Sequence, residues 1–319
     1  MILVLTSDND RTADRVVAEI ARRGAAVGRL DTADFPCRIT INAMLQDEFG
    51  WHGWMETEIG QIRLDKIRAI YYRRPTSFLF PDDVTGSDLT FAAAEARRGF
   101  GGLLFSLRAR WVNHPGRVAD AEFKPTQLYV AAGCGLTVPR TLLTSDLGQA
   151  KIFCETAEKG VVYKPLSAAN IVKGDDVQLV YTSKLCRADL DDIDVSLTVN
   201  LLQDWVPKCY DVRVTVVGRR LFGVAIHAGS SETYVDWRTD YDSLSYEPIE
   251  VPKFVASGIW AYMRHFDLLY GAFDFAVTEK DWYFLECNAN GQFGWLEAET
   301  DLPITAAIAD LLVQESTQN

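Results

Sequence analysis

The sequence FDFAVTEKDWYFLECNAN, residues 273–290, predicts a β-hairpin with oxygen-bearing side chains on its strands. Two halves rich in aromatic and β-branched residues flank the polar TEKD, which is typical of two strands and a turn. If Val277 faces Tyr283 across the hairpin, then Asp274 faces Glu286. Two carboxylates therefore meet at one place on the sheet.

Strict alternation places Asn288 on the same side as both acids, together with Trp282 and Phe284. Three oxygen donors on rigid strands suit Mg²⁺, which takes a few carboxylates and completes its coordination with water and a substrate's phosphates. The alternative is a surface hairpin with ordinary solvated acids. Acids half-buried beside aromatic rings repel each other without a cation, which favours a metal–nucleotide site.

The chain has 319 residues, which is too long for one compact core and indicates two or three domains. A formal net charge of -12 argues against general nucleic-acid binding, because that requires a basic face. The six cysteines form no CxxC pair, which indicates reduced thiols. No basic leader precedes an apolar run, and no stretch approaches a membrane span. We therefore expect a cytoplasmic protein that does not bind membranes.

The first third of the chain predicts an α/β domain. Apolar strands at 2–5 and 27–30 flank a helix at 11–23, so the chain opens β-α-β. The loop between the first strand and the helix has no glycine fingerprint, so no dinucleotide site is expected there. A later strand ends in Arg73 and Arg74. Such a pair forms either a solvated rim or a contact to an anion or carboxylate, and both interpretations stay open.

Charged residues also stand inside or at the ends of apolar elements further along. A helix expected at 118–132 carries Lys124, and an apolar strand ends in Lys164. Asp211 and Arg213 lie two residues apart on one face of a strand made otherwise mostly of valines. A charged pair inside such a strand is costly unless it is partnered, so an anionic ligand or another charge is expected beside it.

The order of these residues resembles the ATP-grasp ligases. A lysine before the middle domain, a lysine on its strand, a QDWV hinge, a DVR strand and a D…ECN set follow one another as in that superfamily. Within it, the chain is most similar to the microviridin-type graspetide macrocyclases, which mature ribosomal peptides. The supporting segments are YYRRP at 71–75, GLTVPRTLLTSD at 135–146, QDWVPKCYDVRVTVVG at 203–218, DWR at 236–238 and FLECNANGQFGWLE at 284–297.

The resemblance implies an α/β (α+β) chain with the ATP-grasp fold in three parts. An N-terminal pre-ATP-grasp α/β domain is expected at 1–117 and a small central ATP-grasp subdomain at 118–198. A C-terminal subdomain with an antiparallel sheet and the Mg²⁺ site is expected at 199–319.

The resemblance also implies roles for individual positions. The nucleotide-binding residues would be Lys124, Lys164, Gln203, Asp204, Trp205, Val206 and Asp211. The catalytic residues, facing the transferred phosphoryl group or the substrate carboxylate, would be Arg213, Arg238 and Lys164. The Mg²⁺ ligands would be Asp274, Glu286 and Asn288, and the substrate-binding residues Arg73, Arg74 and His227.

The implied reaction uses ATP and Mg²⁺ to activate Asp or Glu side chains of a ribosomal precursor peptide as acyl phosphates. Ser or Thr hydroxyls, or Lys amines, of the same peptide then form ester or amide cross-links. The partners would be a precursor with a leader and an acidic core, and a second copy of the chain in a homodimer. The alternatives are an ATP-grasp ligase for free amino acids or short peptides, and a non-catalytic ATP-binding module.

Two departures from the family pattern stand out. The segment LSAAN at 166–170 lacks the glycines that many ATP-grasp proteins use to cover the phosphates. In AIHAG at 225–229, His227 is the nearest basic residue where related glutamate-adding ligases carry an arginine. His227 is either a base for the attacking group or a structural histidine.

Overall fold

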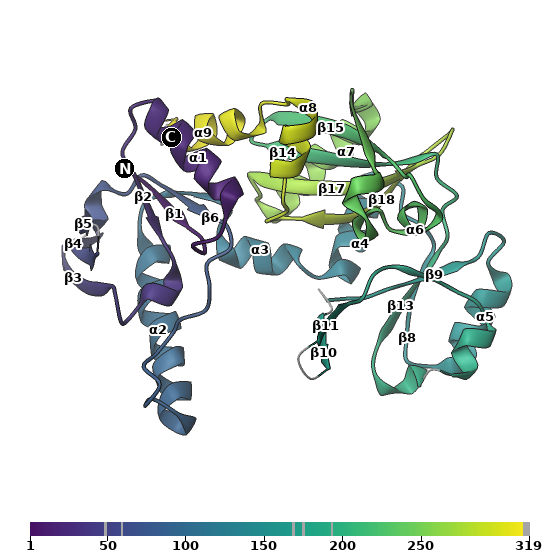
Figure 1. Cartoon of the computed structure of the whole chain (residues 1–319), viewed down its shortest axis with the longest axis horizontal. Helices are drawn as coiled ribbons and strands as arrows, with labels where there is room; N and C mark the ends of the chain where they lie inside the picture. Colours follow the sequence, from purple (N-terminus) through teal and green to yellow (C-terminus); the bar gives the residue numbers. More distant parts are fainter. Residues whose placement is uncertain (48–49, 59, 168–169, 174–175, 193, 315–319) are drawn as a thin grey trace.

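The computed structural model describes residues 1–47, 50–58, 60–167, 170–173, 176–192 and 194–314. Figure 1 shows an N-terminal unit at one end, a sheet-based C-terminal unit in the middle and a smaller central unit at the other end. The expected mixed α/β chain is confirmed. Among the described residues, no helix is long and apolar enough to cross a bilayer.

The N-terminal unit is built on a parallel sheet with the strand order β2-β1-β6-β7. All four side chains of β1 are buried, because a central strand of a parallel sheet is covered on both faces. A small antiparallel sheet, β3-β4-β5, stands beside it, as the alternation between 39 and 64 predicts. The elements of this unit are β1 (Ile2–Leu5), α1 (Arg11–Arg22), β2 (Val27–Leu30), β3 (Thr40–Asp47), β4 (Gly50–Thr57), β5 (Gly60–Arg63), β6 (Ala69–Tyr72), α2 (Gly86–Ser106) and β7 (Arg110–Val112).

The helix expected at 118–132 is two helices, so that prediction was wrong. The first, α3, spans Pro115–Ala121, and the second, α4, spans Lys124–Gly133. Pro125 stands in the first turn of α4. Its ring lacks an N–H and clashes with the carbonyl four residues earlier, so one continuous helix cannot pass through this position. Lys124 therefore becomes the first residue of a new helix.

The central unit has an antiparallel sheet with the strand order β12-β9-β13-β8, and a separate hairpin of β10 and β11. The strand expected to open the C-terminal subdomain, β13, pairs here with β8 and β9. The domain limits themselves stay a prediction. The elements are β8 (Thr141–Thr144), α5 (Leu147–Thr156), β9 (Val161–Lys164), β10 (Asn170–Lys173), β11 (Asp176–Leu179), β12 (Ser183–Leu185) and β13 (Asn200–Asp204).

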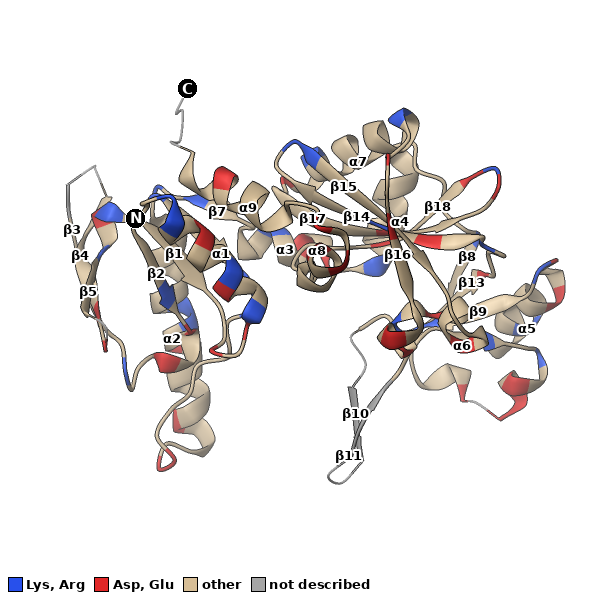
Figure 2. Ribbon diagram, turned by 45° about the horizontal axis from the view of Figure 1, so that its top comes forward, with Lys and Arg blue, Asp and Glu red and all other residues tan. Residues whose placement is uncertain are grey.

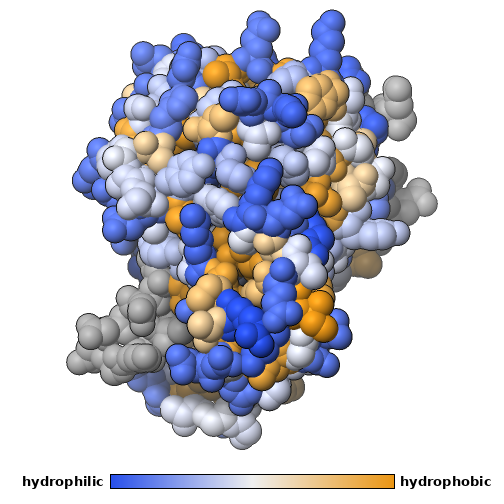
Figure 3. Space-filling view, turned by 90° about the vertical axis from the view of Figure 1, so that its right-hand side faces the viewer, coloured by the Kyte–Doolittle hydropathy of each residue, from blue (hydrophilic) through white to orange (hydrophobic). Residues whose placement is uncertain are grey.

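Figure 3 shows hydrophobic residues scattered among hydrophilic ones on the outer end of the molecule. The most exposed apolar residues of the central unit are Leu197, Val199 and Ile152. A few exposed apolar residues are normal on a protein surface.

The C-terminal unit is a five-stranded antiparallel sheet with the order β16-β15-β14-β17-β18. Helices α4 and α7 pack on one face through a core that contains Ile259, Tyr262 and Phe273. Helix α9 packs with α1 in a second core, which joins the C-terminal sheet to the N-terminal sheet. The elements are β14 (Tyr210–Val217), β15 (Arg220–His227), α6 (Ser231–Val235), β16 (Ser245–Ile249), α7 (Lys253–Phe266), β17 (Tyr270–Val277), β18 (Trp282–Asn288), α8 (Gly294–Thr300) and α9 (Ile304–Val313).

Candidate functional site

One cleft lies between the central sheet and the C-terminal sheet. Ten of the predicted nucleotide, catalytic and metal residues line it: Lys124, Lys164, Gln203, Asp204, Trp205, Val206, Asp211, Arg238, Asp274 and Glu286. Arg213 and Asn288 are hydrogen-bonded to Asp274 in this lining. In Figure 2, acidic and basic residues lie close together around α6 and the end of β9. The cleft therefore has local cations despite the negative charge of the whole chain.

The predicted hairpin forms, but its register near the turn differs from the prediction. Val277 pairs with Trp282 and not with Tyr283. A β-bulge then adds Leu285 to β18, so that Asp274 nevertheless pairs with Glu286, as predicted.

The bulge also changes which side chains share a face. Phe284 is fully buried and packs edge-on against Phe273 and Phe275 in the core, whereas Leu285 and Glu286 line the cleft. The prediction that the acids share a face with Trp282 and Phe284 was therefore wrong. An extra residue in one strand moves all later side chains to the opposite face, which strict alternation cannot anticipate.

Asp274 is held by Arg213, whose strand β14 is the neighbour of β17. The guanidinium donates from Nε to Oδ1 at 2.8 Å and from Nη2 to Oδ2 at 2.7 Å. Burial raises the pKa of Asp274, and the charge of Arg213 only partly opposes this. The rings of Trp237 and Trp295 lie 4.9 Å and 6.0 Å from the guanidinium carbon. Arg213 thus has the partner that the DVR pattern requires.

Glu286 is surrounded by cations. Its Oε2 lies 3.4 Å from Lys124 Nζ, and its Oε1 lies 3.5 Å from Arg238 Nη1. Burial raises the pKa of Glu286, but the charges of Lys124, Arg238 and Lys164 outweigh it and lower the pKa to about 2. Glu286 is therefore ionised at neutral pH.

Asn288 joins the two acids. Its amide nitrogen lies 3.2 Å from Glu286 Oε1 and 3.5 Å from Asp274 Oδ2. The described residues contain no cluster of three or more His, Cys, Asp or Glu side chains suited to a metal ion. Two carboxylates and one amide are enough for Mg²⁺, which takes its other ligands from water and phosphates. The three side chains that were predicted to bind Mg²⁺ fit this cation.

Lys164 differs from Lys124 in having no ion pair among the described residues. Lys124 donates to the carbonyl of Pro165 at 2.6 Å and lies beside Glu286. Burial lowers the pKa of Lys164, the charge of Glu286 opposes this, and the charges of Lys124 and Arg238 add to the lowering, so that the pKa is about 8. A buried cation with no paired anion is well suited to bind a phosphate.

Sequence reasoning missed one acid, Asp236, and one lysine, Lys208, that position the predicted residues. Asp236 accepts two hydrogen bonds from Arg238, from Nε at 2.8 Å and from Nη2 at 2.7 Å, and its pKa is about 2 because these bonds outweigh burial. Lys208 lies 2.6 Å from Asp211, whose pKa burial raises to about 6. The spacings DWR and KCYD carry these pairs in the sequence, but neither shows which partner is buried.

The expected hinge, residues 203–206, runs from β13 along the cleft. Gln203 donates from Nε2 to Thr141 Oγ1 at 2.9 Å, and the backbone N–H of Trp205 donates to the Gly160 carbonyl at 2.8 Å. Asp204 instead forms an ion pair with Arg140 at 2.9 Å. The carboxylate of Asp204 is therefore already bound by a cation within the chain.

The three predicted substrate residues lie outside this cleft lining. Arg73 is buried, pairs with Asp10 at 2.7 Å and also donates to Gln292. Arg74 is exposed at the end of β6. His227 is partly exposed at the end of β15, with its Nε2 3.7 Å from Glu247. The roles of all three stay predictions.

The glycine-poor segment at 166–170 is only partly described, since residues 168 and 169 lie outside the described residues. The structure therefore does not test the consequence of the missing glycines.

Comparison with known proteins identifies close structural relatives. The family model described as the MvdD pre-ATP grasp domain matches residues 1–119. The macrocyclase MdnC from Microcystis aeruginosa MRC, solved with its precursor peptide MdnA, is 29% identical and superposes with a TM-score of 0.85, over 98% of this chain and 99% of that chain. Macrocyclase MdnB from the same organism is 28% identical, with a TM-score of 0.81 and 98% of each chain covered.

A RiPP-associated ATP-grasp ligase from Chryseobacterium gregarium, solved with ADP and a leader and core peptide, is also similar. It is 28% identical and superposes with a TM-score of 0.89, over 98% of this chain and 96% of that chain. A search of curated protein sequences finds no match. The similarity thus extends over nearly the whole chain and includes both sides of the cleft.

Proposed function

We propose that this chain is a member of the family of ATP-grasp macrocyclases that includes MdnB and MdnC, and that it cross-links side chains of a ribosomal precursor peptide at the expense of ATP. An Asp or Glu carboxylate of the peptide is activated as an acyl phosphate. A Ser or Thr hydroxyl, or a Lys amine, of the same peptide then forms an ester or amide.

The observation that supports this proposal most strongly is the composition of the cleft between the central and C-terminal sheets. Lys164 comes from β9 of the central sheet, whereas Lys124, at the start of α4, and the acids of the β17–β18 hairpin come from the C-terminal side. A carboxylate does not react with a hydroxyl or amine at neutral pH until one of its oxygens becomes a leaving group. Cations beside an Mg²⁺-binding acid set are the groups that phosphoryl transfer from ATP requires.

We assign the nucleotide to the part of the cleft between residues 203–206 and the two lysines. Residues 203–206 would contact the base, and Asp211 would lie near the ribose. Lys164 and Lys124 would bind the phosphates, because among the described residues Lys164 has no carboxylate partner and Lys124 shares Glu286 with Arg238. Asp274, Glu286 and Asn288 would hold Mg²⁺, which neutralises the charge of the phosphates when it is bound.

The peptide carboxylate would lie beside Arg213 and Arg238. One of its oxygens attacks the terminal phosphorus of ATP, the bond from that phosphorus to the bridging oxygen breaks, and ADP leaves. The peptide hydroxyl or amine then attacks the acyl carbon, loses its proton and expels inorganic phosphate. Arg213 and Arg238 stabilise the negative charge in both steps. Each arginine is held in place by a bidentate pair, to Asp274 and to Asp236.

The partner and the environment follow from this assignment. The precursor would present a leader and an acidic core, and Arg74 is exposed and available to an acidic segment. A homodimer and a cytoplasmic location stay parts of the proposal.

Oxygen-isotope transfer tests the acyl phosphate. A precursor whose Asp and Glu carboxylates carry ¹⁸O is incubated with the enzyme, ATP and Mg²⁺, and the released phosphate is analysed by mass spectrometry. One ¹⁸O in the phosphate per cross-link is expected. Phosphate that carries no label, released while cross-links form, would exclude the proposed activation step.

A further inference from the structure

The segment 291–294 lies between β18, the strand that carries two of the proposed metal ligands, and the start of α8. Side chains of the N-terminal unit hold it by hydrogen bonds. Gln292 Oε1 accepts hydrogen bonds from Thr12 Oγ1 at 2.9 Å and from the guanidinium of Arg73. The carbonyl of Gly291 accepts from the hydroxyl of Tyr270 at 2.7 Å. This segment is therefore fixed by side chains that are distant from it in the sequence.

The packing around the segment leaves it little freedom. A Cβ at Gly291 would lie 2.6 Å from the Cβ of Ala272, and one at Gly294 would lie 2.7 Å from Thr12 Oγ1. Contacts this short do not occur between ordinary side chains, so the backbone approaches both neighbours as closely as glycine permits. The segment therefore cannot move toward Ala272 or Thr12 without displacing them.

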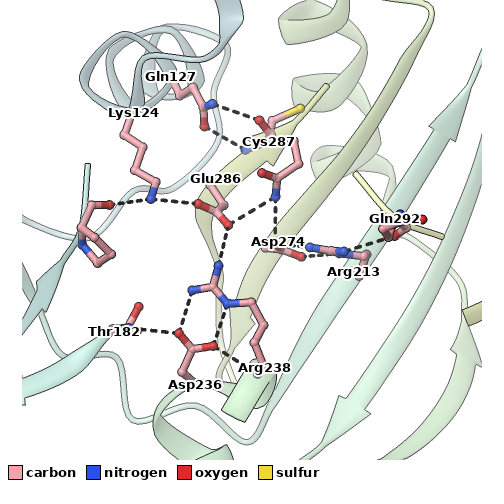
Figure 4. Close-up of polar contacts among 12 residues, drawn as sticks. Lys124, Gln127, Thr182, Arg213, Asp236, Arg238, Asp274, Glu286, Cys287 and Gln292 are labelled. Carbon is pink, nitrogen blue, oxygen red and sulfur yellow. Dashed lines mark hydrogen bonds and ion pairs between the residues drawn. The ribbon is translucent and has the colours of Figure 1, made fainter. Parts of the chain in front are cut away.

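The other side of the same residue faces the cleft. The backbone carbonyl of Gln292 accepts a hydrogen bond from Arg213 Nη1 at 3.3 Å, while the other guanidinium nitrogens of Arg213 bind Asp274 (Figure 4). Gln292 thus touches an arginine of the N-terminal unit with its side chain and an arginine of the cleft with its backbone.

The anchor on the N-terminal side is buried and rigid. Arg73 pairs with Asp10, which also accepts from Thr6 Oγ1 at 2.9 Å and from the backbone N–H groups at the start of α1. Burial raises the pKa of Asp10, but Arg73 outweighs it, and the pKa is below its usual value. Arg73 is therefore directed at the 291–294 segment.

We propose that Gln292 is a positioning residue for Arg213. The buried Asp10–Arg73 pair fixes the side chain of Gln292, and the backbone carbonyl of Gln292 in turn fixes the guanidinium of Arg213. This inference rests on the proposed function, in which Arg213 faces the reacting carboxylate. Asp274 is shared between Arg213 and the cation site, whereas the carbonyl of Gln292 has no competing ligand among the described residues. Gln292 therefore holds the arginine whatever binds to the acids.

The test compares Gln292→Met with Gln292→Glu. Methionine has a similar length but no acceptor, so it releases the side chain from Arg73 and Thr12. Glutamate keeps a side-chain oxygen that can accept the hydrogen bonds from both Arg73 and Thr12. Arg15→Met is the matched control, because Arg15 donates to the carbonyl of Gly294 at 3.0 Å and so binds the same segment without touching Gln292.

The cross-linking rate is measured at saturating precursor and ATP, together with the KM of each and the thermal midpoint. We expect Gln292→Met to lower kcat by roughly ten- to a hundredfold, because a small misplacement of a catalytic group has an effect of this size. The KM for ATP should change little. Gln292→Glu should recover most of kcat, and Arg15→Met should stay near the wild type.

The inference is overturned if Gln292→Met loses no more kcat than Arg15→Met, or if glutamate and methionine behave alike. The wild-type reaction separates this result from a failure of the proposed function. If the wild type forms ADP without cross-links, the proposed function fails and the rate of ADP formation serves for the same comparison. If it forms neither product, both proposals are wrong.

Discussion

Arg213 and Asp274 form a bidentate ion pair inside the C-terminal sheet, and both residues are almost completely buried. Each neutralises the other before any ligand is bound. A cation that binds Asp274 must therefore compete with Arg213, and the arginine then becomes available to a substrate anion. The pair links the predicted metal site to the predicted carboxylate site.

The first prediction concerns the stability of this pair. Arg213→Met leaves the Asp274 carboxylate buried without its ion-pair partner, which should lower the free energy of unfolding by about 3–5 kcal/mol. The double variant Arg213→Met/Asp274→Leu removes both charges and should recover much of this loss. Denaturant unfolding measures both. If the single and double variants are destabilised equally, the loss of stability does not come from leaving the Asp274 carboxylate without its ion-pair partner.

The second prediction concerns pH. The pKa of Lys164 is lowered to about 8, chiefly by burial, so the side chain loses its charge as the pH rises through this value. A bound phosphate favours the protonated form. The affinity for ADP should therefore be constant below about pH 7 and fall by up to about tenfold per pH unit above pH 8.

Calorimetric titration of ADP without Mg²⁺ measures this profile. Lys164→Met should bind ADP more weakly and should lose the pH dependence above pH 8. If the ADP affinity of Lys164→Met depends on pH as in the wild type, a group other than Lys164 causes the pH dependence.

Much of the site was predictable because hairpins and strand-end charges are local patterns. The pairing of Asp274 with Glu286 was predicted from alternation, but in the structure it results from a turn register that is one residue off and a bulge at Leu285 that compensates for it. The bulge could not be predicted, because Phe284 packs in a core that other elements help to form. The division of the expected helix at 118–132 into two helices could have been predicted from Pro125.

Contacts between segments that are far apart in the sequence could not be predicted from local patterns. Arg73 and Gln292 are separated by 219 positions, and nothing local in YYRRP shows that its first arginine binds a loop near the C-terminus. A strand-end arginine is equally compatible with solvent, with a ligand or with a buried partner. Only the packing of the N-terminal unit on the C-terminal unit through α1 and α9 decides between them.

The third prediction concerns Asp236. Asp236→Asn keeps the shape of the side chain but removes the charge that holds Arg238, so the arginine loses its fixed position beside Glu286. We expect the cross-linking rate to fall by roughly ten- to a hundredfold. Asp242→Asn is the control, because Asp242 is exposed near the same loop. Similar rates for the two variants would exclude a positioning role of Asp236.

The fourth prediction concerns Mg²⁺. Glu286→Gln removes one of the two carboxylates of the proposed cation site, so half-maximal ADP formation should require a much higher Mg²⁺ concentration. Glu279→Gln, in the exposed turn of the same hairpin, should leave the Mg²⁺ dependence unchanged. The Mg²⁺ dependence of ADP formation is measured for both. If Glu286→Gln keeps the wild-type dependence, the cation is held elsewhere.

The most direct test of the central claim is the mass of a candidate precursor peptide after incubation with the enzyme, ATP and Mg²⁺. We predict the loss of one water per cross-link, with one ADP formed for each. Omission of ATP or Mg²⁺ should leave the mass unchanged. An unchanged peptide mass in the complete reaction, with ADP formed only when free amino acids are supplied, would contradict the claim that the chain is a peptide macrocyclase.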